Sequence, residues 1–153
     1  MCLAFAFASA VGSAAAVEPP RAAAPTAVEL TLVGGPQLNP NAQGRASPVV
    51  VRIFDLASTP GFEAADFTTL FEHVETLKGT VLSIDELVLH PGQIEERTRD
   101  LKPGVRALAV AAAFRELEGT SWRVVAVLRP GARNFLLVQA DQNRIRLQTQ
   151  DSN

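Results

Sequence analysis

Residues 104–115 read GVRALAVAAAFR, and a strand-like pattern resumes at Trp122 after a turn at 119–121. Side chains on a β-strand alternate between its two faces. On a strand over 104–115, one face would carry the large residues Leu108, Val110 and Phe114, and the other only Ala107, Ala109, Ala111 and Ala113. This pattern predicts a strand inside a two-layer β-structure, with another element packed closely against the alanines. It indicates a scaffold rather than a catalytic pocket.

The composition limits the classes of protein to consider. The 153 residues have room for one domain of ordinary size, and an apolar content of 47% excludes wholesale disorder. A formal charge of −2 gives no electrostatic drive toward nucleic acid, and the aromatic residues are not interleaved with Lys or Arg. We therefore expect no nucleic-acid partner.

The N-terminal part of the chain has the composition of an export segment followed by a spacer. Residues 2–16 are apolar or small and end in three alanines, so 1–16 is predicted to be an export signal. Residues 17–26 are rich in Pro and Ala and predict a tether, which leaves 27–150 as the domain. Cys2, the only cysteine, rules out an internal disulfide. It lies either within a signal core or at a lipid-anchored site in a chain whose true start is upstream.

Period-2 apolar patterns and Pro/Gly turns predict seven or eight strands from residue 28 to residue 148. The charged stretch 94–101 is expected at a sheet edge. Phe67, Leu70, Phe71, Val74 and Leu77 fall at helical spacing and predict one amphipathic helix. The predicted fold is mainly all-β, a two-sheet antiparallel sandwich with one inserted helix. The aromatic residues assigned to its core are Phe54, Phe67, Phe114 and Trp122.

No pattern of residues indicates catalysis. His73 and His90 are the only histidines and lack metal-ligand spacing, so we expect no metal and no cofactor. No Gly-x-Ser-x-Gly turn is present, and neighbouring acids such as Asp85 and Glu86 would point to opposite faces of a strand. The arginines of the last third of the chain form either a solvated face or a docking surface. We predict that the protein is not an enzyme.

Seven short marks occur in a definite order along the chain: LNP at 38–40, PVVVRIFDL at 48–56, ADF at 65–67 with Leu70, LHPG at 89–92, GV at 104–105, AFR at 113–115 and WR at 122–123. In this order the chain resembles the outer-membrane lipoprotein family of type VI secretion, TssJ (VasD/SciN), over residues 27–148. The resemblance implies a transthyretin-like sandwich with an extra helix. It also implies attachment to the periplasmic face of the outer membrane by an acylated cysteine, for which Cys2 is the only candidate.

The same resemblance implies the partners. Family members bind the periplasmic C-terminal region of TssM, and together with TssL they build the membrane complex of the secretion system. In the family the loop after the first strand takes part in that contact, which corresponds here to 37–47. We therefore hypothesise a partner-binding site in which Leu38 is the apolar anchor, with the residues Leu38, Asn39, Pro40, Asn41, Gln43 and Arg45. The alternative is that Asn39 and Pro40 only shape the turn.

Two other classes of function remain open at this stage. A periplasmic transthyretin-like module that binds a small ligand would hold it in an apolar pocket between the sheets or under the helix. An exported enzyme would need a cluster of charged residues that the sequence does not show.

Overall fold

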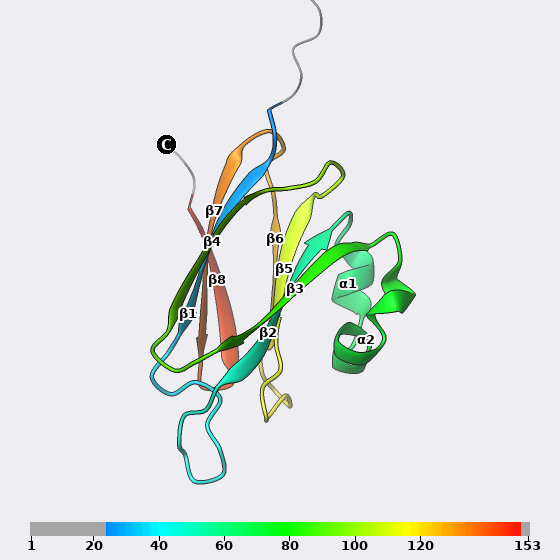
Figure 1. Ribbon diagram of the computed structural model, residues 1–153. Helices are drawn as coiled ribbons and strands as arrows, with labels where there is room; N and C mark the ends of the chain where they lie inside the picture. The colour runs from blue at the N-terminus through cyan, green and yellow to red at the C-terminus, as the bar shows by residue number, and fades with distance from the viewer. Residues whose placement is uncertain (1–23, 151–153) are drawn as a thin grey trace, which may run out of the picture.

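The computed structural model describes residues 24–150, which form two packed β-sheets (Figure 1). Sheet A has the strand order β4-β1-β7-β8, and sheet B has the order β3-β2-β5-β6. The strands are β1 (Ala27–Gly34), β2 (Val49–Leu56), β3 (Val81–Leu89), β4 (Ile94–Asp100), β5 (Ala107–Ala112), β6 (Arg123–Val127), β7 (Arg133–Asp141) and β8 (Arg144–Gln150). The predictions for residues 1–23, which include the export signal, most of the tether and Cys2, lie outside the described residues.

The predicted two-sheet sandwich is confirmed, with one difference in strand direction. All of the strand pairs are antiparallel except β1 and β7, which run parallel in sheet A. Sequence patterns predict hairpins between consecutive strands. β1 and β7 are far apart in the sequence, so no local pattern predicts that they pair. The charged strand β4 is at the edge of sheet A, as its sequence predicted.

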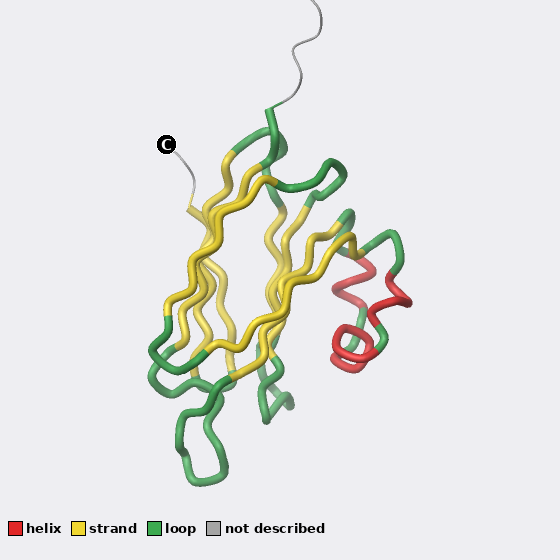
Figure 2. The backbone as a smooth tube through the Cα atoms, in the orientation of Figure 1, coloured by secondary structure: helices red, strands yellow, loops and turns green. Residues whose placement is uncertain are grey.

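β5 is shorter than the predicted strand over 104–115, but its two faces pack as that stretch predicted. Leu108 and Val110 enter the core between the sheets, and so does Phe114 from the connection that follows β5. Ala107, Ala109 and Ala111 form the floor of a second cluster on the outer face of sheet B, where Phe54, Phe62 and Leu70 are fully buried. Because alanine reaches only as far as Cβ, the helical segment can lie close against the sheet (Figure 2).

The single predicted helix is wrong, because the segment is broken into α1 (Pro60–Ala64), α2 (Phe67–Glu72) and the 3-10 turn η1 (Val74–Leu77). Ala65 is extended and Asp66 caps a new helix by accepting a hydrogen bond from the Thr69 N–H at 2.7 Å. Helices this short are not stable alone. Arginines of sheet B hold them in place.

These arginines donate to carbonyl oxygens of the short helices. Arg52 of β2 donates to the Leu70 and Phe71 carbonyls at 3.0 and 2.8 Å. Arg123 of β6 donates to the carbonyls of α1 and its cap, those of Phe62, Glu63 and Ala65. Carbonyl groups near the C-terminal ends of both helices, where an α-helix leaves acceptors without partners, thereby gain a donor.

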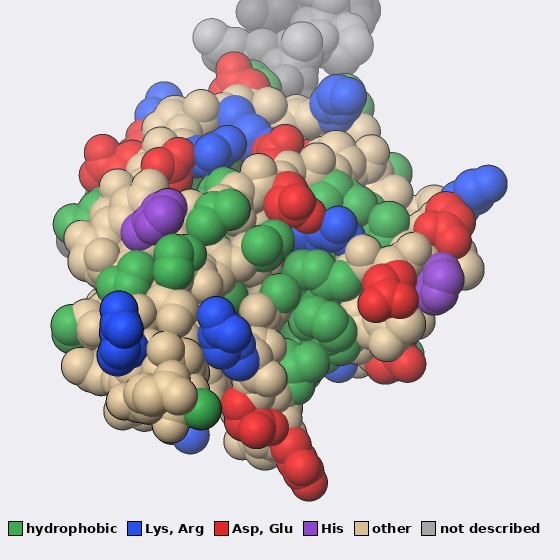
Figure 3. Space-filling view, turned by 60° about the horizontal axis from the view of Figure 1, so that its bottom comes forward, with side chains coloured by type: hydrophobic (Ala, Val, Ile, Leu, Met, Phe, Trp, Pro, Cys, Tyr) green, Lys and Arg blue, Asp and Glu red, His purple; other side chains and the backbone are tan. Residues whose placement is uncertain are grey.

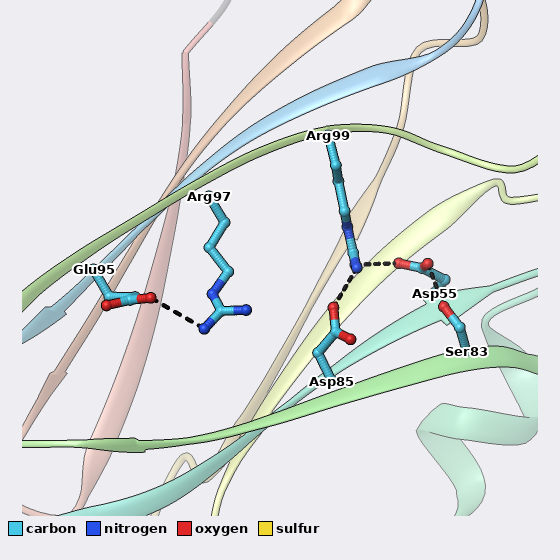
Figure 4. Close-up of polar contacts among 6 residues, drawn as sticks. All are labelled: Asp55, Ser83, Asp85, Glu95, Arg97 and Arg99. Carbon is cyan, nitrogen blue, oxygen red and sulfur yellow. Dashed lines mark hydrogen bonds and ion pairs between the residues drawn. The ribbon is translucent and has the colours of Figure 1, made fainter.

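A group of charged side chains joins the two sheets along the β3/β4 side (Figure 4). Arg99 of β4 reaches across to Asp55 of β2, with 2.6 Å between Nη2 and Oδ1, and also pairs with Asp85 of β3. The Asp55 side chain is only 7% exposed and also accepts from the Ser83 hydroxyl. A carboxylate this buried needs such partners, since an unpaired buried charge is strongly destabilising.

The strands place their connections at two opposite ends of the sandwich (Figure 1). We call one the loop end: it holds the connections 35–48, 90–93, 113–122 and 142–143. We call the other the tether end: it holds residues 24–26 and the connections 101–106 and 128–132. No helix among residues 24–150 has the length and apolar character needed to cross a membrane.

Candidate partner-binding site

The connection between β1 and β2 is the longest at the loop end, but its apolar residue is not on the surface. The Leu38 side chain is 0% exposed and belongs to the core between the sheets. The prediction that Leu38 is an exposed anchor is therefore wrong. Burial in an adjacent core stabilises a large apolar side chain even when its residue belongs to a loop, and the core here continues into the start of the loop.

Asn39 is also buried, and it ties three connections of the loop end together. Its side-chain amide donates to the Pro48 carbonyl at 2.8 Å, and its side-chain oxygen accepts from the Arg115 N–H at 2.9 Å. Its own N–H donates to the Gln142 carbonyl at 2.7 Å. The backbone has a φ of 46°, a conformation that asparagine tolerates better than most residues. The prediction that Asn39 contacts the partner directly is therefore corrected. Asn39 is 3% exposed, and its hydrogen bonds hold the connections together.

The tip of the loop is exposed and is ordered by its own hydrogen bonds. The Asn41 side-chain oxygen accepts from the N–H groups of Gln43 and Arg45, both at 3.0 Å. The Asn41 backbone exchanges further bonds with Arg45 and Gly44. Pro40 and Asn41 are half-buried, whereas Gln43 and Arg45 are exposed. The tip is thus a preformed turn that presents Gln43 and Arg45 to solvent.

The neighbouring turn between β3 and β4 is hydrogen-bonded to the start of this loop. The Gly34 carbonyl accepts from Gly92, and the Gly34 N–H donates to Gln93, so the β3/β4 turn is bonded to the end of β1. A Cβ on Gly34 would clash with the His90 carbonyl oxygen, so only glycine fits there. Together with the Asn39 bonds, these contacts join the four connections into one rigid end.

A hollow of about 430 Å³ lies beside the loop, and its position argues against the ligand-binding alternative. It is lined by residues from the end of β1 and from β7 and β8, among them Gly35, Asp141, Arg144 and Arg146. These residues are on the outer side of sheet A. That alternative required a pocket between the sheets or under the helices, and both of those spaces are occupied by buried side chains.

An apolar strip that the sequence did not predict adjoins the loop end on sheet B. Phe67 stacks on Phe71 with centroids 4.4 Å apart and meets Trp122 edge-to-face at 5.4 Å. All three residues are half-buried. Trp122 packs against both hydrophobic clusters, so its core assignment holds in part, whereas Phe67 belongs to neither cluster and its core assignment is wrong. Val88 on the same sheet is 49% exposed. Figure 3 shows hydrophobic side chains gathered among charged ones when the loop end faces forward.

The tip of the long loop offers the exposed side chains of Gln43 and Arg45 as hydrogen-bonding groups. Within residues 24–150, no group of three or more His, Cys, Asp or Glu side chains is arranged to hold a metal ion. Among the described residues, Asp66 has a side-chain pKa clearly below its ordinary value, because the Thr69 side chain and backbone hydrogen-bond to its carboxylate. Asp66 is the cap of α2 and is not part of the loop end.

The fold and the hydrogen-bonded loop end define a β-sandwich domain that displays loops at one end. The comparisons with known proteins place it more closely. The profile of the T6SS-SciN family, described as type VI secretion lipoprotein, VasD, EvfM, TssJ, matches residues 26–149. The chain belongs to this family of type VI secretion lipoproteins. A search of curated proteins found no match.

Solved structures agree with this assignment. The chain is similar to the type VI secretion lipoprotein TssJ1 from Pseudomonas aeruginosa, with 30% identity and a TM-score of 0.81, over 84% of this chain and 99% of that one. It is similar to a chain of a structure described as a type VI membrane complex, with 28% identity and a TM-score of 0.70, over 80% and 97%. A chain in a structure described as the TssM C-terminal domain (869–1107) from EAEC has 27% identity and a TM-score of 0.67, over 80% and 97%.

Proposed function

We propose that this protein is the lipoprotein subunit of a type VI secretion membrane complex and that its loop end binds the periplasmic C-terminal region of TssM. The observation that carries the proposal is the preformed tip of the β1–β2 loop, at the end of the domain opposite to the N-terminal tether. A preordered loop binds with little loss of conformational freedom. The role is structural, with TssL in the same complex.

The similarity to a chain in the TssM structure supports the choice of partner. The matched chain is about half as long as the span 869–1107, because 80% of this 153-residue chain covers 97% of it. The matched chain is therefore a companion of the TssM domain in that structure rather than the domain itself. A protein with the same fold as ours thus occurs together with a TssM C-terminal domain.

The burial of Leu38 and Asn39 moves the proposed contact to the tip of the loop. Gln43 and Arg45 are exposed, and their backbone bonds to Asn41 do not depend on their side chains. Pro40 and Asn41 contribute by fixing the shape of the turn. Substitutions at 43 and 45 can therefore test the contact without changing the fold.

The test is a calorimetric titration of the cognate TssM periplasmic C-terminal region with wild-type protein and two variants. The loop variant carries Gln43→Ala and Arg45→Glu. The control variant carries Arg106→Glu, the same change of charge on an exposed residue of the tether end. We expect the loop variant to bind at least about tenfold more weakly, a difference of about 1.4 kcal/mol, and the control to bind as wild type. Unchanged affinity of the loop variant, or an equal loss in the control, would contradict the proposal.

We also propose that Cys2 is acylated and that the protein is attached to the periplasmic face of the outer membrane. The family is described as one of lipoproteins, and Cys2 is the only cysteine of the sequence. In cells fed a labelled fatty acid, the wild-type protein should carry the label and fractionate with outer membrane. The variant Cys2→Ser should lose both properties, and a label that persists in this variant would rule out Cys2.

A further inference from the structure

The polypeptide leaves the domain between two connections of the tether end. The Thr26 carbonyl accepts from the Leu101 N–H at 2.8 Å, and the Thr26 hydroxyl accepts from the Gly131 N–H at 2.9 Å. The next residue, Ala27, donates to the Ala132 carbonyl at 3.0 Å. The chain therefore enters the domain at Thr26, next to the connections 101–106 and 128–132.

Among the described residues, these two connections and the start of β7 carry more basic than acidic side chains. The exposed cations Lys102 and Arg106, with Arg129 and Arg133 beside them, form what we call the tether-end basic surface; Arg129 and Arg133 each already have a partner. Within residues 24–150 the nearby acids are Asp100, which is exposed, and Glu29, which is paired with Arg133. This excess contrasts with the formal charge of −2 for the whole chain.

The basic surface is built on fixed backbone. The Arg106 N–H donates to the Leu56 carbonyl at 2.7 Å, and the Arg106 carbonyl accepts from Leu128 at 2.9 Å. Asn134 bonds to both the N–H and the carbonyl of Arg129. The cations therefore extend from anchored positions, so that several of them can meet one surface together.

Exposed apolar side chains lie at the same end. Val127, the last residue of β6, is 77% exposed and directly precedes the connection 128–132. Leu82, at the start of β3, is 43% exposed and close to Gly104 in the other connection. Large apolar side chains next to Lys and Arg are typical of surfaces that lie in the headgroup region of a bilayer.

We propose that the tether end of the domain docks on an anionic phospholipid surface, with Lys102 and Arg106 near the phosphates and Val127 in the headgroup layer. This inference rests on the proposed membrane anchor, because the anchor keeps this end close to lipid and raises its effective concentration there. Each Lys or Arg near an anionic surface strengthens binding by roughly fivefold. The docked domain would point its loop end away from the membrane.

The experiment measures sedimentation of residues 17–153 with lipid vesicles at low ionic strength. All of the buried apolar residues of the described structure lie between Ala27 and Ile145, and the TssJ1 chain matches over 99% of its own length, so this part contains the folded domain. The vesicles contain phosphatidylethanolamine with roughly 30% phosphatidylglycerol, or phosphatidylcholine alone. We expect binding to the anionic vesicles that weakens with salt.

The matched variants decide whether the binding belongs to the tether end. Lys102→Glu with Arg106→Glu should lower the partition coefficient at least about tenfold. Arg144→Glu with Arg146→Glu, the same change of charge on exposed residues of β8, should leave it unchanged. Val127→Ser should also lower the partition coefficient, but by a smaller factor than the charge reversal does. Equal losses in the two charge variants, or no preference of the wild type for anionic vesicles, would overturn the proposal.

Testing the same variants in both the vesicle assay and the TssM titration separates this proposal from the proposed function. If the basic surface binds an acidic protein instead of lipid, vesicle binding is absent and Lys102→Glu with Arg106→Glu weakens the TssM titration. If only the lipid proposal fails, vesicle binding is absent and the TssM titration is as expected for the loop end. Failure of the proposed function alone leaves vesicle binding intact.

Discussion

The loop end and the half of the sandwich next to the tether end, which we call the tether half, are held together by different kinds of contact. At the loop end, neutral hydrogen bonds through Asn39 join three connections. In the tether half, Arg99, paired with Val28 near the start of β1, joins the two sheets through the carboxylates of Asp55 and Asp85. Because the two kinds of contact share no residue, we expect that each half can be weakened without the other. The proposed function would benefit from this, since it assigns a different binding surface to each end.

The largest expected effect is at the ion pairs of the tether half. Arg99→Met leaves Asp55 buried without its cation, and we expect the free energy of unfolding to fall by about 3–5 kcal/mol. Chemical denaturation measures this. Arg97→Met on the same strand is the control: Arg97 pairs with Glu95 in a partly exposed position, and its loss should cost about 1 kcal/mol or less. Similar losses in the two variants would show that the cross-sheet pairs are not special.

A double variant sharpens the same point. Replacing both Asp55 and Arg99 by Leu removes the buried charge together with its partner, and this should recover much of the stability that Arg99→Met loses. If the double variant is as unstable as the single one, the cost lies in packing rather than in the unpaired carboxylate.

The next largest effect is at the clamp of the loop end. Asn39→Ala leaves the Arg115 N–H and the Pro48 carbonyl without their partner and places Ala at a φ of 46°. Each unsatisfied group costs about 1–3 kcal/mol. We expect faster amide hydrogen exchange in 37–48 and 113–117 and weaker binding of TssM, with unchanged binding to anionic vesicles.

The control for this prediction is Asn41→Ala in the exposed tip of the loop. Its acceptor bonds are in contact with water, so exchange should rise only near residues 43–45. Faster exchange in 113–117 in this control, or normal exchange there in Asn39→Ala, would contradict the role of Asn39 as a clamp.

The smallest effect is at Asp66, which belongs to neither end. The Thr69 hydrogen bonds hold the pKa of this carboxyl below its usual value of 3.8, so the cap stabilises the folded state above that pH. The stability is lost as the pH falls through the lowered pKa of the folded state. Asp66→Ala should therefore reduce the melting temperature slightly at pH 7 and by less at pH 3. A larger loss at pH 3 would mean that the charge is not what stabilises the cap.

The sequence predicted the features of the fold that have a local period. The alternation in 104–115 gave β5 with its alanine face, and the charges of 94–101 gave an edge strand. The break at Ala65 and Asp66 was missed because the apolar spacing continues through it, while the cap at Asp66 depends on short-range hydrogen bonds.

The sequence predicted a long loop after the first strand, and the structure has one, but the placement of two residues within it was misread. Leu38 seemed to be an anchor because it is the one large apolar residue between turn formers, yet the core accepts it. Asn39 bonds to Arg115 and Gln142, which are far away in the sequence, so no local pattern could reveal the clamp. Contact of Gln43 and Arg45 with a partner stays a prediction.

The central claim is that partner and membrane use opposite ends of one rigid domain. The most direct test is the partition of residues 17–153 onto anionic vesicles, measured with and without a saturating amount of the TssM periplasmic C-terminal region. The account predicts the same partition coefficient in both cases, with TssM carried down together with the vesicles. A fall in partition as TssM is added would mean that the two binding surfaces overlap and would contradict the account.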